Sequence, residues 1–166
     1  AGAEFVVVGH SERRQFFHET NETVNKKTKA ALKNNLTPIV CIGETLDERE
    51  SQKTWRVLET QLAGGLKGFA PADLAKMVVA YEQVWAIGTG KTATPAQAQE
   101  AHLFVRAQLK KLYGANLAVG ARILYGGSVT AENVDSLMAQ ADVDGALVGG
   151  ASLKKDAFLR IMGFKP

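Results

Sequence analysis

Five short apolar runs, none of which alternates polar and apolar residues, constrain the fold of this chain most. They are FVVVG at 5–9, PIVCIG at 38–43, MVVAYE at 77–82, RILYGG at 122–127 and GALVGG at 145–150. A strand with one face in water shows alternation, whereas a strand of a parallel sheet is apolar throughout because both of its faces are covered. The runs therefore predict five parallel strands, each buried on both faces.

Stretches with the period of a helix separate these runs. The clearest covers 94–114, with Thr94 as the N-cap, Pro95 in the first helical position and Gly114 just past the end. The other expected helices cover 20–35, 45–65, 130–141 and 152–164. Strands that alternate with helices predict an α/β fold with right-handed βα units. The sequence has no linker or internal repeat, so we expect one domain over residues 1–166.

The composition disfavours several classes of protein. The net charge is +3 over 166 residues, and the basic residues are spread along the chain, which argues against a nucleic-acid or membrane partner. One cysteine, Cys41, cannot form an internal disulfide, and no apolar run is long enough to span a bilayer. The three histidines, His10, His18 and His102, have no partner at ligand spacing, so we expect no metal site. A cytoplasmic protein is the simplest interpretation.

Polar or glycine-rich residues follow every apolar run. These clusters are GHSERR at 9–14, GET at 43–45, YEQVWAIGTGKT at 81–92, YGGSV at 125–129 and GGASL at 149–153. Parallel strands end at the same edge of a sheet or barrel, so these clusters should meet there. We therefore expect the functional site at the carboxyl ends of the strands.

Glu82 and His10 are the candidate acid–base residues at this edge. A carboxylate in an apolar site has a raised proton affinity that suits a general base, although Glu82 can also be read as a surface glutamate at a strand end. His10 precedes SERR, which can begin a helix whose positive end disfavours imidazolium. We expect a neutral imidazole that donates a hydrogen bond, although a lone histidine is more often a packed or surface residue.

Two glycine loops indicate phosphate binding, whereas a third glycine-rich motif, GTGKT, does not match a nucleotide-binding P-loop. GTGKT invites a nucleotide-binding interpretation, but Trp85 stands where a nucleotide-binding P-loop needs its first glycine. The glycines of YGGS and VGGAS offer backbone amides ahead of a helix, which is a geometry that can hold phosphate. Simple turns are the alternative for these two loops.

Five motifs together carry a resemblance to a known family. In their order and spacing, VVVGHSERR, CIGE, AYE-VWAIGTGKTATP, LYGGSV and DGALVGGASL make the sequence resemble triosephosphate isomerases. The resemblance covers essentially the whole chain and corresponds to the latter two-thirds of the family's usual length. It implies a partial (β/α)8 TIM barrel, with five parallel strands and outer helices, that lacks the first three βα units.

The resemblance also implies a function. The family interconverts dihydroxyacetone phosphate and glyceraldehyde 3-phosphate, in glycolysis and gluconeogenesis, by proton transfer through an enediolate and without a cofactor. By resemblance, Glu82 is the base, His10 polarises the carbonyl oxygen and Glu12 supports the site. Cys41 and Glu44 resemble structural members of its surroundings.

A lid and a phosphate site follow from the same resemblance. The lid loop would comprise Trp85, Ala86, Ile87, Gly88, Thr89, Gly90, Lys91 and Thr92. Main-chain donors to the substrate phosphate would come from Gly88, Ser128, Gly149 and Gly150, and Ile87 and Leu147 would line the site.

The chain departs from the family pattern in two ways. Gln83 stands where the family has proline, at the front hinge of the lid, so we expect a freer hinge. The family's lysine and asparagine at the end of its first strand have no counterpart, so we expect the isolated chain to be nearly or wholly inactive. Five strands cannot close an eight-stranded barrel, so we also expect a homo-oligomer formed through the open barrel interior and the strand edges. The alternatives are a non-catalytic self-assembling chain and a phosphate-binding module.

Overall fold

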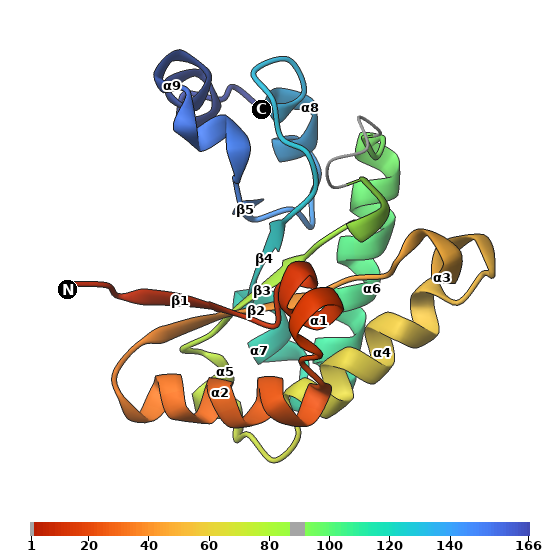
Figure 1. The fold of residues 1–166 in the computed structure, drawn as a ribbon, viewed down its shortest axis with the longest axis vertical. Helices are drawn as coiled ribbons and strands as arrows, with labels where there is room; N and C mark the ends of the chain where they lie inside the picture. The colour runs from red at the N-terminus through yellow and green to blue at the C-terminus, as the bar shows by residue number, and fades with distance from the viewer. Residues whose placement is uncertain (1, 87–91) are drawn as a thin grey trace.

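A parallel sheet forms the centre of the computed structural model, which describes residues 2–86 and 92–166. Within these residues the sheet has the strand order β1-β2-β3-β4-β5 (Figure 1). The strands are β1 Phe5–Val8, β2 Thr37–Ile42, β3 Val78–Tyr81, β4 Arg122–Tyr125 and β5 Gly145–Ala146. Every pairing is parallel. The prediction of an α/β fold with five parallel strands is confirmed, whereas the single domain stays a prediction.

Each of the first four strands pairs with the strand that follows it in the chain. The register places Val7 opposite Ile39 and Tyr81 opposite Tyr125. The carboxyl ends of the strands therefore lie at one edge of the sheet, and the loops that follow them gather there. This edge carries the candidate site.

Helices occupy most of the chain between the strands. The α-helices are α1 Ser11–Phe17, α2 Asn21–Lys33, α3 Leu46–Glu50, α4 Thr54–Gly65, α5 Pro71–Leu74, α6 Pro95–Tyr113, α7 Ala115–Gly120, α8 Val134–Met138 and α9 Lys155–Met162, and the 3₁₀ helices are η1 Val84–Ala86 and η2 Gly150–Leu153. The helix predicted over 94–114 is confirmed as α6, with the Thr94 hydroxyl accepting a hydrogen bond from the Gln97 N–H at 3.2 Å. The short helices α5 and α7 were not predicted.

The single helix predicted over 45–65 is wrong, because this segment forms two helices. Thr45 and Glu48 cap α3 reciprocally, each side chain accepting a hydrogen bond from the other residue's backbone N–H. The helix ends at Glu50, and Gln52 takes a φ of 57°, in the left-handed region that cannot continue a right-handed helix. The chain then turns and α4 begins at Thr54.

The last two predicted helices are shorter than expected. In place of 130–141, α8 begins only at Val134, because the Asn133 side chain accepts from the Thr130 N–H and donates to the Ser128 carbonyl. These local bonds satisfy the backbone outside a helix. In place of 152–164, the separate helix η2 precedes α9, which ends before Gly163.

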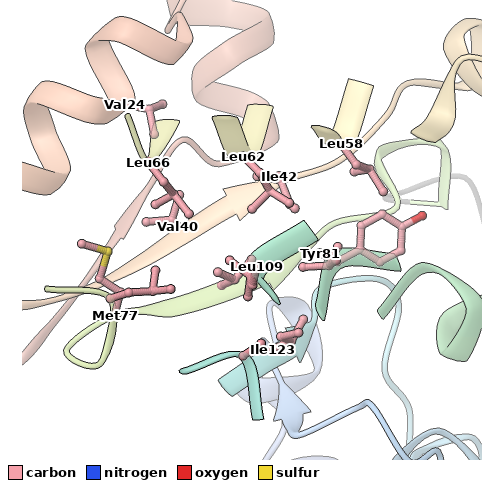
Figure 2. Close-up of a cluster of buried hydrophobic side chains, with 14 of the residues drawn as sticks. Val24, Val40, Ile42, Leu58, Leu62, Leu66, Met77, Tyr81, Leu109 and Ile123 are labelled. Carbon is pink, nitrogen blue, oxygen red and sulfur yellow. The ribbon is translucent and has the colours of Figure 1, made fainter. Parts of the chain in front are cut away.

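The main hydrophobic core lies on the face of the sheet that α2, α4 and α6 cover (Figure 1). Figure 2 shows Val40 and Ile42 of β2 beside Leu62 of α4 and Leu66, the residue after that helix, with Leu109 of α6 close to β3. These side chains are fully buried. Burial of this apolar surface is the main stabilising contribution to the positions of the strand ends.

Strand β1 departs from the predicted burial. Val8 belongs to the core, but Phe5 is 48% and Val7 is 44% exposed. Successive side chains of a strand point to opposite faces, so only one face of β1 is well covered. The prediction of cover on both faces is therefore wrong for this edge strand. Among the described residues, no helix is both long and apolar enough to cross a membrane.

Candidate active site

A cavity of about 780 Å³ lies at the carboxyl ends of β1, β3, β4 and β5. It brings together residues from loops that are far apart in the sequence. Its walls include six of the predicted site residues, namely His10, Glu82, Ser128, Leu147, Gly149 and Gly150. A second cavity, of about 740 Å³, lies between α1, α2 and α4 and is lined by neither His10 nor Glu82. The first cavity is therefore the candidate active site.

The side chains of Glu82 and His10 contact each other in this cavity. The His10 Nε2 atom lies 2.8 Å from Glu82 Oε1, and the Ser11 backbone N–H donates to Glu82 Oε2 at 2.9 Å. The Glu12 backbone N–H donates to His10 Nδ1 at 3.3 Å. Because Nδ1 accepts a hydrogen bond, the proton of a neutral ring sits on Nε2, where it can be donated. The Nε2 atom is therefore placed to donate to Glu82, while the neutral state of His10 stays a prediction.

The environment of Glu82 favours a proton-accepting carboxylate. The residue is only 2% exposed, and this burial raises the pKa of its carboxyl group above the ordinary value. His10, the Ser11 N–H and Arg14 act in the opposite direction, but burial outweighs them. A carboxyl group with a raised pKa is a stronger base, which suits proton abstraction near neutral pH.

Two glycines let the neighbouring strands approach Glu82 closely. A Cβ atom on Gly43, after β2, would lie 1.8 Å from the Glu82 carbonyl oxygen. A Cβ atom on Gly126, after β4, would lie 3.0 Å from Glu82 Cγ. Gly43 therefore serves close packing of backbones, a role that the sequence did not distinguish from a simple turn.

Glu44 is buried next to the site and makes a dense set of hydrogen bonds. The Tyr81 hydroxyl lies 3.1 Å from each of its carboxylate oxygens, and the Trp85 Nε1–H and Arg49 Nη1 donate to Oε1 at 3.0 and 3.1 Å. The Arg49 guanidinium also lies 4.6 Å from the Trp85 ring centroid. This cluster holds η1 against α3 and supports the structural role expected for Glu44.

Gln83, the residue after Glu82, is fully buried. Its Oε1 atom accepts a hydrogen bond of 2.9 Å from the Tyr125 hydroxyl, whereas its Nε2 atom has no hydrogen-bond partner in the described part of the chain. The contact joins the end of β3 to the end of β4. The sequence did not predict it, and the freer hinge expected from this residue stays a prediction.

Comparison with known proteins identifies the family. The sequence model of the family "Triosephosphate isomerase" matches residues 1–165. The chain belongs to the triosephosphate isomerase family. A triosephosphate isomerase of Geobacter metallireducens is 61% identical over 165 residues, which cover 99% of this chain and 66% of that protein. One of Geotalea uraniireducens is 60% identical, and one of Alkaliphilus oremlandii is 52% identical.

The chain does not span the whole of its relatives. The Geotalea uraniireducens alignment covers 99% of this chain and 65% of the relative, and the Alkaliphilus oremlandii alignment covers 98% and 66%. The chain thus spans about two thirds of the length of the triosephosphate isomerases that it matches.

The remaining site predictions fall outside the cavity or outside the described residues. Glu12 is exposed on α1 and reaches His10 through its backbone N–H. Trp85 and Ala86 are buried in η1, and Thr92 is exposed. The lid and phosphate predictions for Ile87, Gly88, Thr89, Gly90 and Lys91 lie outside the described residues. Among the described residues, no group of three or more His, Cys, Asp or Glu is placed to hold a metal ion.

Proposed function

We propose that the cavity isomerises a phosphorylated triose, interconverting dihydroxyacetone phosphate and glyceraldehyde 3-phosphate without a cofactor. The observation that carries the proposal is the 2.8 Å contact between Glu82 Oε1 and His10 Nε2, inside a cavity that Ser128 and Gly149 also line. Membership of the family supports it. The reaction belongs to glycolysis and gluconeogenesis, and we place the protein in the cytoplasm with those pathways.

The two side chains divide the proton transfers between them. The Glu82 carboxylate removes a proton from the carbon next to the carbonyl group, leaving an enediolate and a protonated glutamate. His10 donates a hydrogen bond from Nε2 to the carbonyl oxygen, where negative charge develops. His10 Nε2 then passes its proton to that oxygen while the ring takes up the proton of the neighbouring hydroxyl group, and Glu82 returns its own proton to the adjacent carbon, so the carbonyl and hydroxyl groups exchange places. Since Nε2 donates to Glu82 in the structure, substrate has to enter between the two groups before the reaction starts.

The phosphate group belongs at the other side of the cavity. Residues 127–128 and 149–150 line this wall together with the apolar Leu147, whereas the Gly126 N–H already donates to the Tyr81 carbonyl oxygen. Several backbone N–H groups converging on one point form an anion site. By resemblance, Gly88 contributes a further N–H.

The proposal is tested by measuring proton exchange, and not complete turnover alone. We expect dihydroxyacetone phosphate in D₂O to acquire deuterium in the presence of the protein, as followed by NMR, and Glu82→Gln to abolish the exchange. Glu22→Gln, on the exposed surface of α2, is the matched control. The family's first-strand lysine and asparagine have no counterpart in these 166 residues, so slow exchange and little isomerisation are expected.

A complementation experiment distinguishes the catalytic proposal from its alternatives. In it, the third of a relative that this chain does not cover is added to the protein as a separate segment. Isomerase activity restored by that segment, and lost again in Glu82→Gln, supports the catalytic proposal. Binding of the segment without activity would favour a self-assembling chain. Phosphate binding without any exchange would favour a phosphate-binding module. Equal exchange by the parent and Glu82→Gln would contradict the assigned base.

We also propose that the protein forms a homo-oligomer through its open sheet. In the described structure β1 pairs only with β2, so the hydrogen-bonding groups of its outer edge have no strand partner. The exposed side chains of Phe5 and Val7 lie on this strand. Unpaired edges and apolar patches favour association of chains. A monodisperse monomer in light scattering at micromolar concentration would contradict this proposal.

A further inference from the structure

The side chain of Gln83 ties the backbone that follows Glu82 to the neighbouring strand. The Tyr125 hydroxyl, at the end of β4, donates to Gln83 Oε1 at 2.9 Å, and both side chains are fully buried. Backbone pairing between β3 and β4 reaches only as far as the Tyr81 carbonyl, which accepts from the Gly126 N–H at 2.8 Å. The contact of Gln83 therefore extends the connection between the two strands past the candidate base.

The backbone of Glu82 is held from both neighbouring strands as a result. On the side of β2, the Glu82 N–H donates to the Ile42 carbonyl at 2.7 Å, and Gly43 packs against the Glu82 carbonyl oxygen. On the side of β4, the amide of Gln83 is the anchor. Proton transfer needs its reacting groups placed to within about 1 Å. Anchors before and after the base meet this need, because they restrict the backbone that carries the carboxylate.

The loop after β4 packs directly on the Gln83–Tyr125 contact. A Cβ atom on Gly127 would lie 2.5 Å from the Tyr125 hydroxyl oxygen and 2.9 Å from Gln83 Oε1. Gly127 also lines the candidate active-site cavity, whereas neither Gln83 nor Tyr125 is among the described residues that line it. The contact thus lies beneath the cavity wall, next to Glu82 in the chain and under the loop that faces it.

Stability alone does not favour glutamine at this position. The Gln83 Nε2 atom is buried without a hydrogen-bond partner among the described residues, and an unpaired buried donor costs free energy. A methionine side chain has nearly the same length and would avoid that cost. The family has proline here, whose ring fixes φ. In this chain, a hydrogen bond to the next strand restrains the same stretch of backbone.

We propose that Gln83 is a positioning residue for the base of the proposed isomerisation, and that its hydrogen bond with Tyr125 orients Glu82 toward His10. The inference rests on the proposed function, because it concerns the base of that reaction. Gln83 acts through the backbone that it shares with Glu82. The 2.8 Å contact between Glu82 Oε1 and His10 Nε2 reports the resulting geometry.

Three variants separate this geometry from stability. Gln83→Met removes the hydrogen bond together with the unpaired Nε2 atom, and Tyr125→Phe leaves both polar atoms of the Gln83 amide unpaired. The double variant removes every polar atom of the contact, a change that is often neutral or stabilising. We therefore expect Tyr125→Phe to unfold at a lower urea concentration than the parent, and the double variant to unfold at the concentration of the parent or above it.

Tyr113→Phe is the matched control. The Tyr113 hydroxyl, at the end of α6, donates to the Leu66 carbonyl at 2.6 Å, and Tyr113 is not part of the described cavity wall. This variant therefore loses one tyrosine hydrogen bond, as Tyr125→Phe does, but loses it away from Glu82.

The experiment measures two properties of the whole chain. The first is the NMR signal of the His10 ring, with the exposed His18 ring as an internal reference. The second is the rate at which dihydroxyacetone phosphate acquires deuterium in D₂O. Gln83→Met, Tyr125→Phe and the double variant should displace the His10 signal to the same extent and slow the exchange by about 10- to 100-fold. Tyr113→Phe should keep the parent values of both.

The outcomes distinguish this inference from the proposed function. An unchanged His10 signal in the double variant would overturn the positioning role of Gln83. Displacements that add together in the double variant, or that follow the urea midpoint and appear in Tyr113→Phe as well, would also overturn it. Absence of exchange in the parent, together with the expected displacements of the His10 signal, would contradict the proposed function and still support the orientation of Glu82 by Gln83.

Discussion

His102 shows how a single buried residue makes this fold sensitive to acid. The side chain is fully buried, and its ring lies near those of Tyr81 and Tyr125, at centroid distances of 5.9 and 6.3 Å. Its Nδ1 atom lies 3.2 Å from the Asp142 carbonyl oxygen, and Nε2 has no hydrogen-bond partner among the described residues. Burial lowers the pKa of His102 to about 4. The folded protein therefore holds this histidine neutral.

The pH dependence follows from the direction of that shift. An unfolded histidine titrates near pH 6.5, so between pH 6.5 and 4 the unfolded chain binds more protons than the folded chain at this position. The contribution of His102 is complete above pH 6.5 and falls by about 3 kcal/mol as the pH drops toward 4. Urea unfolding of His102→Gln should lose this part of the pH dependence, whereas His18→Gln, on the exposed surface, should keep it. The same pH dependence in both variants would contradict the assignment.

At the scale of residues, the sequence predicted the candidate acid–base pair and the structural role of Glu44, but not the contacts that join the strand ends. Glu82 and His10 could be predicted because each follows an apolar run directly, and an ionisable residue there is unusual. The hydrogen bond between Tyr125 and Gln83 joins positions 42 residues apart. No local pattern marks such a pair, and the same holds for Arg49 beside Trp85. Contacts that depend on how two strands meet become visible only in three dimensions.

Between elements, Gly43 decides how closely β2 and β3 can approach at the site. An added methyl group would lie 1.8 Å from the Glu82 carbonyl oxygen, so the backbone after β3 would have to move. We expect Gly43→Ala to lower the free energy of unfolding by about 2–3 kcal/mol, as in overpacked cores. It should also change the NMR signal of the His10 side chain, because the contact with Glu82 is displaced. Gly120→Ala, where nothing lies within 4 Å, is the control. Equal stability of both variants would contradict this reading.

The elements themselves were predicted where one pattern dominated. The apolar runs located every strand to within a few residues, and Thr94 with Pro95 located the start of α6. The break between α3 and α4 was missed because Gln52, rather than glycine, occupies the left-handed position. The start of α8 was missed because the Asn133 side chain competes with helical hydrogen bonding. In both cases a local conformation overrode a helical pattern of apolar residues.

At the scale of the molecule, the parallel direction of the strands followed from the alternation of strands and helices, but the cover of the sheet did not. An apolar run indicates what a strand can bury, not what lies over it. In the structure α2, α4 and α6 cover one face, while Phe5 and Val7 of the edge strand remain partly exposed (Figure 1). The sequence therefore predicted that both faces of every strand are covered, and the structure shows that one face of β1 is not.

A charge on the edge strand tests whether that exposed surface holds chains together. Lysine on a sheet edge opposes pairing with another strand, because the charge would be buried in the new interface. We expect Phe5→Lys to shift the protein toward the monomer in sedimentation velocity, raising the dissociation constant of the oligomer by at least about 10-fold, the cost of roughly 1.4 kcal/mol. Val119→Lys, at an 80% exposed position on α7, should leave the oligomer unchanged. If both variants associate as the parent does, the oligomer forms through another surface and β1 is not its interface.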